Sequence, residues 1–377
     1  SDNQQFHFTF NIIFIVKFNN ICKNLVVIVY IGCDISMQAV QSKRFWRDTD
    51  AAIPNSLAIS YVLFGHAAGI YLLLQPGWLF FIVGTLLAGH SLVIAAYLIH
   101  EAAHMTLFKA KKHNILFGEI LLWFAGGSYA SFSRVRHMHL RHHKDKADVS
   151  CFDYQAFLKK QPRFVQKIVY ALEWAYIPAV ELIMHGQVIV RPFTEEKLKP
   201  YRRRVIFTAI SRLTFFYLLF SFNPLALLGY AIAYWIMLQA LFLADAFAHT
   251  YDAFFVDNAN DEIPAHNRNN DYDVEHTYSN LISRKHPWLN LLNLNFGYHT
   301  AHHARASVAW HQLPDFHNQI YGNTQHEKVL PYGELLKTIH KNRLNRIFVD
   351  DYGDVGSGPN RADSFIGAHG VSFLSIV

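Results

Sequence analysis

Four long apolar stretches, arranged as two pairs, constrain the fold of this 377-residue chain more than any other feature. Residues 57–74 and 78–99 form one pair, and residues 205–222 and 225–247 form the other; a short turn containing proline joins each pair. About 20 apolar residues in a helix cross a bilayer, and helices satisfy their own backbone hydrogen bonds there. The sequence therefore predicts an all-α integral membrane fold with two transmembrane helical hairpins, or four spans.

The charge pattern predicts which way the hairpins face. Charged residues make up only 16% of the chain and the net charge is +6, and both hairpin turns lack Lys and Arg. Basic residues concentrate outside the hairpins, at Lys109, Lys111, Lys112, Arg134, Arg136, Arg141, Lys144, Lys146 and Arg202 to Arg204. By the positive-inside rule both hairpins open toward the cytosol, where residues 105–204 and 250–350 form a helical cap. The basic charge reflects topology, so no nucleic-acid partner is predicted.

The remaining segments divide the chain into three parts. Residues 1–36 are apolar but interrupted by Lys and Asn, and the first methionine is Met37, so this part is predicted to be an upstream extension or a weak N-terminal anchor. Residues 37–350 form the membrane domain. Residues 351–377 are rich in Gly and Ser and are predicted to be a flexible tail. Arg212 interrupts the third span and is expected to snorkel toward the interface.

The first histidine cluster ends the second apolar stretch. His100 and His104 are four residues apart, so on a helix they share a face and can reach one metal ion. Glu101 completes an H-E-x-x-H pattern, which is also found in zinc proteases. That alternative needs one further ligand, whereas the chain offers many more histidines.

Two further clusters repeat the pattern H-x-x-H-H. One comprises His139, His142 and His143, and the other comprises His299, His302 and His303. Spacings of three and four residues turn all three imidazoles of each cluster toward one side of a helix. His137 lies about 200° around the same helix, so it is predicted to support the ligands from outside or to lie at the surface.

A fourth group, Asp245 and His249, ends the fourth apolar stretch and mirrors the first cluster. At such depth the pair is either functional or an interfacial pair that merely ends the span. His249 is a predicted ligand, and His276 is the competitor for its place. The predicted metal ligands are therefore His100, His104, His139, His142, His143, His249, His299, His302 and His303. Four ligands close one zinc site, so nine imply two metal ions. Imidazole suits iron, zinc, copper and nickel alike, so spacing leaves the metal open.

These residues resemble the three histidine boxes of the membrane fatty acid desaturase family, the integral-membrane di-iron desaturase/hydroxylase superfamily. The resemblance covers most of residues 57–320, and it makes residues 37–350 a fatty acid desaturase domain. It implies two iron ions, O2 as co-substrate and His249 as the additional ligand, with no catalytic residue or organic cofactor beyond the metal ligands. In known members Asn at the position of Asp245 can hold a water, so the resemblance implies a direct or water-mediated role for Asp245, with Asp as a departure. The stretch from Glu275 to His299 is more similar to bacterial-type members, including hydrocarbon oxygenases, than to animal acyl-CoA desaturases.

The resemblance implies an oxidoreductase that introduces a double bond into an acyl chain linked to a lipid, to CoA or to a carrier protein. Hydroxylation, decarboxylation and hydrocarbon oxygenation are alternatives on the same scaffold. A His-rich zinc transporter or sensor is an alternative of another class. The chain has no haem motif and no cysteine cluster, so the electrons are expected from a ferredoxin or cytochrome b5. The expected location is a bacterial inner membrane rather than the endoplasmic reticulum, with the site on the cytosolic side.

Overall fold

The computed structural model describes residues 7–17, 26–36, 45–251, 254–256, 264–322, 328–349 and 351–369. Residues 1–44 and 45–377 are two separate compact units. In the first unit, β1 (His7–Lys17) and β2 (Val26–Ser36) pair as an antiparallel hairpin. Their assignment to an upstream extension or an anchor stays a prediction.

The first predicted pair of spans is a helical hairpin. The segments α1 (Ala52–Ser60), the π-helical η1 (Tyr61–Gly65) and α2 (His66–Leu73) follow one another directly, and α3 (Trp78–Ala103) returns beside them. Glycines allow the two arms to pack closely: a Cβ on Gly84 would lie 2.8 Å from the carbonyl oxygen of Gly69. Both arms are long and apolar enough to cross a membrane.

The second pair forms a hairpin as well. A 3-10 turn, η2 (Glu196–Tyr201), leads into α9 (Arg202–Phe222), and α10 (Pro224–Ala246) follows. Asn223 caps α10 by accepting from the backbone of Leu225, and its Nδ2 donates to the carbonyl of Leu73 at 2.9 Å, which links the turns of the two hairpins. These helices complete the four candidate spans, so the prediction of two transmembrane hairpins is confirmed.

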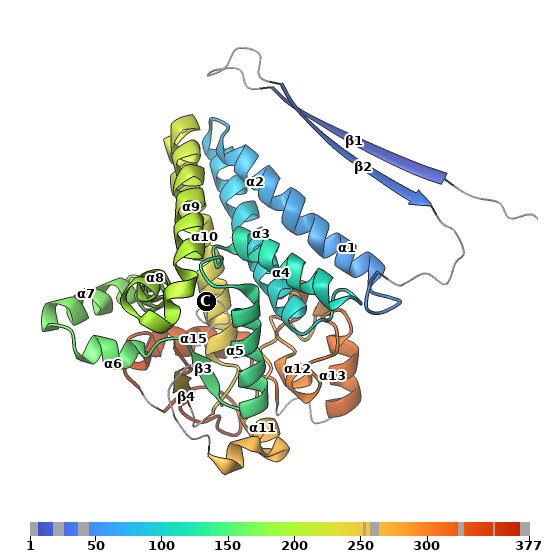
Figure 1. The fold of residues 1–377 in the computed structure, drawn as a ribbon. Helices are drawn as coiled ribbons and strands as arrows, with labels where there is room; N and C mark the ends of the chain where they lie inside the picture. Colours follow the sequence, from blue (N-terminus) through green and yellow to red (C-terminus); the bar gives the residue numbers. More distant parts are fainter. Residues whose placement is uncertain are drawn as a thin grey trace, which may run out of the picture. The chain divides into compact units, whose positions relative to one another are not determined.

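The cap is built from the two segments outside the hairpins. The first contributes α4 (Lys111–Ala125), α5 (Phe132–Asp145), β3 (Asp148–Ser150), α6 (Tyr154–Lys159), α7 (Arg163–Trp174) and α8 (Ala179–Thr194). The second contributes β4 (Phe254–Val256), η3 (Ala265–Arg268), α11 (Asn270–His276), η4 (Pro287–Asn293), α12 (His299–Ala304), α13 (Leu313–Tyr321), α15 (Tyr332–Asn342) and η6 (Asn345–Ile347). Figure 1 shows the spans extending together beyond one end of the cap, with α5 and α12 below them.

Two segments have structural features that their composition does not indicate. Residues 252–275 are polar and rich in Asn and Asp, which favours a loop, but β4 pairs in parallel with β3 and α11 forms one short helix. Asn269 starts that helix by capping Asp271, a local signal that composition hides. The described tail, residues 351–369, has no regular element, yet Ala362 and Phe365 are fully buried.

Candidate metal centre

The first histidine cluster lies at the buried end of α3. His100 belongs to the last turn of the helix and His104 is its C-cap. The neighbouring Glu101 is buried and accepts hydrogen bonds from the Thr106 hydroxyl at 2.7 Å and from the backbone N–H of Trp310 at 3.1 Å. Glu101 therefore ties the end of the span to the segment that follows the third histidine cluster.

The second cluster lies on α5, which Ser131 caps by accepting from the backbone of Arg134. His139 and His143 face one side, and His142 is turned toward His249, with the two Nε2 atoms 3.1 Å apart. The rotation follows from helix geometry, since neighbouring residues differ by about 100° whereas residues four apart differ by about 40°. One helix therefore supplies ligands to two places.

The last ligands come from the end of α10 and from α12. His249 lies beyond the last residue of α10, in an isolated bridge with Thr277. His299 and His303 of α12 face His249, and His302 faces the opposite way, toward His143. The third cluster thus divides between two places as the second does.

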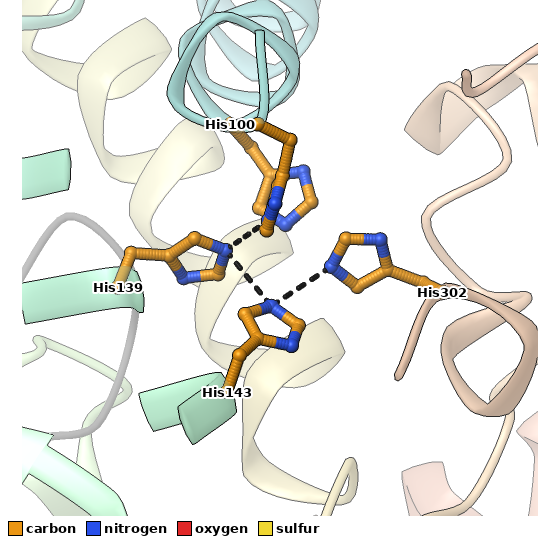
Figure 2. A group of neighbouring side chains, drawn as sticks. His100, His139, His143 and His302 are labelled. Carbon is orange, nitrogen blue, oxygen red and sulfur yellow. Dashed lines mark hydrogen bonds between the residues drawn. The ribbon is translucent and has the colours of Figure 1, made fainter. Parts of the chain in front are cut away.

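The structure sorts all nine predicted histidines into two groups, and in each group one nitrogen per ring lies within 4.8 Å of every other. The first group, here the A group, is His100, His104, His139, His143 and His302; the second, the B group, is His142, His249, His299 and His303. Figure 2 shows four rings of the A group turned toward a common centre from α3, α5 and α12. The sequence predicted that these nine side chains lie together, and the structure brings them together.

Distances within the A group fit a single ion. The Nε2 atoms of His104 and His139 are 2.6 Å apart, those of His139 and His143 are 3.2 Å apart, and those of His143 and His302 are 3.1 Å apart. A metal with nitrogen ligands at about 2.1 Å places adjacent ligands roughly 3.0 Å apart and opposite ones roughly 4.2 Å apart. The His139–His143 and His143–His302 spacings match the adjacent distance, and the His104–His139 spacing is shorter than it.

The protonation pattern of the B group calls for a cation. Nδ1 of His142 lies 2.8 Å from the carbonyl of Ala147, which only accepts, so that nitrogen carries the proton and Nε2 presents a lone pair. The Thr277 hydroxyl donates to Asp273, so it accepts from Nδ1 of His249, whose Nε2 is also a lone pair. These two Nε2 atoms are only 3.1 Å apart. Facing lone pairs repel, and a metal ion between them removes the repulsion.

His303 supplies a third lone pair to the same group. Its Nδ1 lies 3.2 Å from Oδ1 of Asp273 and donates to that carboxylate. Its Nε2 is buried and has no hydrogen-bond partner within the described part of the chain. A buried nitrogen with a lone pair and no donor nearby is the arrangement of a metal ligand whose outer nitrogen is held by a carboxylate. The donor set therefore fits a metal ion.

Burial is the main cause that lowers the pKa of His104 and that of His142 to about 3, so these two rings are neutral at pH 7, as metal ligation requires. Neutral rings bind a metal ion without a competing proton at pH 7. Among the described residues, both groups offer a cation only imidazole nitrogens and no carboxylate oxygen.

Asp273 on α11 is the support that sequence reasoning missed. Besides His303 it accepts from Lys146 at 2.8 Å and from the Tyr251 hydroxyl at 2.5 Å. Burial acts to raise the pKa of this carboxyl, but His303, Lys146 and Tyr251 outweigh it and lower the pKa well below its usual range. Asp273 stays ionised and holds the ring of His303, while no spacing pattern in the sequence connects it to a histidine box.

Three other residues named from the sequence lie outside both groups. His137 is exposed on α5. His276 is half-buried, bonds the carbonyl of Tyr272 through Nδ1 at 2.8 Å and stacks on that tyrosine ring, so His249 takes the place for which His276 competed. Asp245 shares no helix face with His249, because α10 ends at Ala246.

Glu173, Glu181 and His369 form a further buried group. Nε2 of His369 faces Glu173 at 3.8 Å and Nδ1 faces Glu181 at 3.1 Å. The two nitrogens of one ring point to different carboxylates, and buried Arg346 interacts electrostatically with both Glu181 and Glu173. The group joins the tail to α7 and α8.

An apolar cavity of about 650 Å3 lies between α1, α3 and η4. Its lining includes Ile94, Leu294 and Trp310. The ring of Phe296, two residues beyond Leu294, lies 5.0 Å from the rings of both His100 and His299, so it contacts the A and B groups together. Phe296 belongs to the same packed cluster as the lining residues Ile94, Leu294 and Trp310, so it connects the wall of the cavity to both histidine groups.

A polar chain holds the wall of this cavity in place. The Tyr61 hydroxyl donates to Nδ1 of His90 at 2.6 Å, and Nε2 of His90 donates to the carbonyl of Leu292 at 3.0 Å. His90 was isolated in the sequence, and here it attaches η4 to the spans. Trp288 of η4 is 65% exposed, in keeping with a segment that lies at the membrane interface.

Comparison with known proteins agrees with this geometry. No curated protein matches the chain significantly. The family model described as fatty acid desaturase matches residues 76–335, more than half of the chain and a range that spans all three histidine boxes. With its four candidate spans and two histidine groups, this membrane protein belongs to the fatty acid desaturase family.

Proposed function

We propose that the chain is an O2-dependent fatty acid desaturase that introduces a double bond into an acyl chain, with one iron ion held by the A group and one by the B group. The observation that carries this proposal is the pair of histidine groups together with an apolar cavity, whose wall packs against Phe296, the aromatic residue that contacts both groups. Family membership supports a desaturase-like or hydroxylase-like oxidoreductase on this scaffold.

Two iron ions in these groups would supply what no side chain can, the oxidation of an unactivated C–H bond by O2. In the balanced reaction two adjacent CH2 groups each lose one hydrogen, and O2 takes these up with two further electrons and two protons to leave as two waters. The A group offers five nitrogens and the B group four, so neither set fills all six positions of an octahedral ion. Open positions are what a small co-substrate needs.

The residues of the chain bind and orient the substrate. The cavity lined by Ile94, Leu294 and Trp310 accepts a hydrocarbon chain and excludes water, which protects the oxidant. Phe296 limits how far the chain advances, so it helps to choose the carbons that reach the centre. Asp273 and the carbonyl of Ala147 hold His303 and His142 in fixed tautomers throughout.

The remaining partners follow from the chemistry and the charge pattern. The chain belongs, in this proposal, to a bacterial inner membrane with its histidine centre on the cytosolic side, and a ferredoxin or cytochrome b5 delivers the electrons. Lys109, Lys111 and Lys112 are exposed just after the first histidine cluster, and they offer a basic surface to an acidic carrier. The acyl group arrives on a lipid, on CoA or on a carrier protein.

The test is expression in a bacterium that lacks desaturases, together with a ferredoxin and its reductase, followed by mass spectrometry of the cellular lipids. We expect new unsaturated acyl chains with the wild type and with His137→Ala, and none with His302→Ala. If only hydroxylated chains or terminal alkenes appear, the proposed desaturation is wrong, and the reaction is hydroxylation or decarboxylation instead. Two zinc ions and no iron in the purified protein would favour a transporter or sensor.

A further inference from the structure

A second cavity, of about 350 Å3, lies between α8, α9, α10 and the turn after α4. Its polar lining is Tyr129, His185, Arg212, Tyr230 and Tyr234. None of these residues belongs to either histidine group, and the residues lining this cavity include no Asp or Glu. The lining of this cavity therefore combines the guanidinium of Arg212 with tyrosine hydroxyls and contains no acidic side chain.

Arg212 is the unusual member of this lining, because it belongs to the membrane span α9. It lies ten residues after Arg202, which is about 15 Å along the helix. Its Nε and Nη2 are buried and have no hydrogen-bond partner among the described residues, and snorkelling of this side chain stays a prediction. Ionisable groups at such depth are costly and usually serve a function.

A second arginine of the same helix shows how such a charge is normally satisfied. Arg204, two turns before Arg212, donates from Nη2 to Glu119 at 2.6 Å and from Nε to the carbonyl of Ser128 at 2.7 Å. Thr208, between the two arginines, donates to the same carbonyl. Glu119 and the carbonyl of Ser128 therefore accept from residues one and two turns before Arg212, whereas Nε and Nη2 of Arg212 have no such acceptor among the described residues.

The two nitrogens in question form one hydrogen-bonding edge. In Arg191 the same pair, Nε and Nη2, binds both oxygens of Glu195, at 2.5 and 3.1 Å. This edge of a guanidinium matches the two oxygens of a carboxylate or phosphate. Arg212 therefore presents into a cavity the edge that elsewhere in this chain holds a carboxylate.

The rest of the cavity suits an anion with a hydrocarbon tail. Burial, followed by the charge of Arg212, lowers the pKa of His185 to about 4, so this ring is neutral at pH 7 and adds a polar group without a second charge. Tyrosine hydroxyls supply further donors, while Phe216 and Leu227 line the apolar part. On the adjoining surface of α9, Leu213 and Tyr217 are more than 60% exposed, as for a helix face against lipid.

We propose that this cavity binds the oxyanionic head group of an amphipathic lipid, a carboxylate or a phosphate, on the Nε and Nη2 edge of Arg212, with the hydrocarbon chain along Phe216 and Leu227. The site shares no residue with the histidine centre and does not depend on the proposed reaction. If no lipid binds in this cavity, the desaturase proposal is unaffected. If the chain has no desaturase activity, the lipid-site proposal is unaffected.

The test measures binding of radiolabelled oleate to the purified full-length protein in a non-ionic detergent. We expect Arg212→Gln to weaken the main binding component at least tenfold and to leave the iron content unchanged. Arg203→Gln removes the same charge from an exposed position of the same helix and should bind as the wild type does. Methyl oleate, which has no anionic oxygen, should not compete.

Competition by phosphatidylglycerol identifies the source of the oxyanion. Stronger displacement by this lipid than by oleate itself indicates a phosphate head group, and weaker displacement indicates a fatty acid. Equal binding of both lipids to the wild type and Arg212→Gln would overturn the proposal, as would competition by methyl oleate.

Two milder variants guard against misfolding of Arg212→Gln. Arg212→Lys keeps the charge but loses the two-nitrogen edge, and Tyr129→Phe removes one hydroxyl. Each should weaken binding severalfold while the protein keeps its unfolding temperature. If both bind oleate and phosphatidylglycerol as tightly as the wild type, the site is not an oxyanion site.

Discussion

Oδ1 of Asp273 lies 3.2 Å from Nδ1 of His303, so a carboxylate on α11 fixes the tautomer of a ring on α12. Replacement by Asn keeps the size but removes the charge and an acceptor shared with Lys146 and Tyr251. We expect Asp273→Asn to lower metal affinity of the B group by about 10- to 100-fold. Metal content after dialysis against a chelator measures the effect, and Asp271→Asn, an exposed change on the same helix, should retain the metal.

Two histidines that lie two residues apart on α5 should respond oppositely to replacement by alanine. His139 belongs to the A group, whereas His137 is exposed. His139→Ala should lose the metal of the A group and the activity, and His137→Ala should keep both. The metal-to-protein ratio of the purified variants decides the point, and metal loss in His137→Ala would show that the group extends further than the geometry indicates.

Phe296 should control which carbons react. Its ring contacts both histidine groups and packs with the cavity-lining residues Ile94, Leu294 and Trp310, so in the proposed function a smaller side chain lets an acyl chain advance. We expect Phe296→Leu to shift the double bond along the chain while metal content is kept. Mass spectrometry of derivatised products locates the bond, and Leu291→Val at the outer wall of the cavity is the control. An unchanged bond position would remove Phe296 from substrate positioning.

His317 of α13 should make stability depend on pH. Burial, and next the charge of Arg284, lowers its pKa in the folded protein to about 4 from an ordinary 6.5. The unfolded chain therefore takes up a proton below pH 6.5 that the folded chain refuses, so stability falls as pH falls toward 4, by about 1.4 kcal/mol per pH unit. The unfolding temperature of the wild type should drop more between pH 7 and 5 than that of His317→Gln; His137→Gln should match the wild type.

Two glycines offer a matched pair for stability. Gly126 ends α4 with φ +87°, and a Cβ there would lie 2.8 Å from the ring of Tyr234. Gly186 is in the middle of α8, and a Cβ there would meet nothing within 4 Å. Gly126→Ala should therefore cost more than about 1 kcal/mol, whereas Gly186→Ala should stabilise by about 0.5–1 kcal/mol. Thermal unfolding of both variants in detergent tests the difference.

The spans and the histidine boxes could be predicted because both depend on local periodicity. Hydropathy ended the second span at residue 99 because His100 and Glu101 are polar. In the structure both side chains are buried, and α3 continues to Ala103. Spacings of three and four residues identified nine ring positions, but the expectation that all three rings of an H-x-x-H-H cluster face one side was wrong, because adjacent residues differ by about 100° around a helix and each cluster divides between the two groups. The division into two groups also follows from rotation, but only when the helices that face each other are known.

Other parts of the site depend on contacts between distant segments. Asp273 and Tyr251 reach His303 only because α11 packs against the cap, and no periodic pattern marks either residue. The pairing of Asp245 with His249 assumed a helix that in the structure stops at Ala246. Helix ends are set by packing as much as by sequence, so a relation that spans an end is the least secure kind of prediction.

The B group takes its four rings from α5, from the end of α10 and from α12, and the A group takes its five from α3, α5 and α12. No continuous fragment shorter than the stretch from His100 to His303 therefore contains both complete sets of ligands. A break between the hairpins would leave each half with unfinished sets, and a cap expressed without its spans would lack His100. Two separately made halves would have to reassemble within one membrane before either metal could be held, so metal loading reports on assembly of the whole chain.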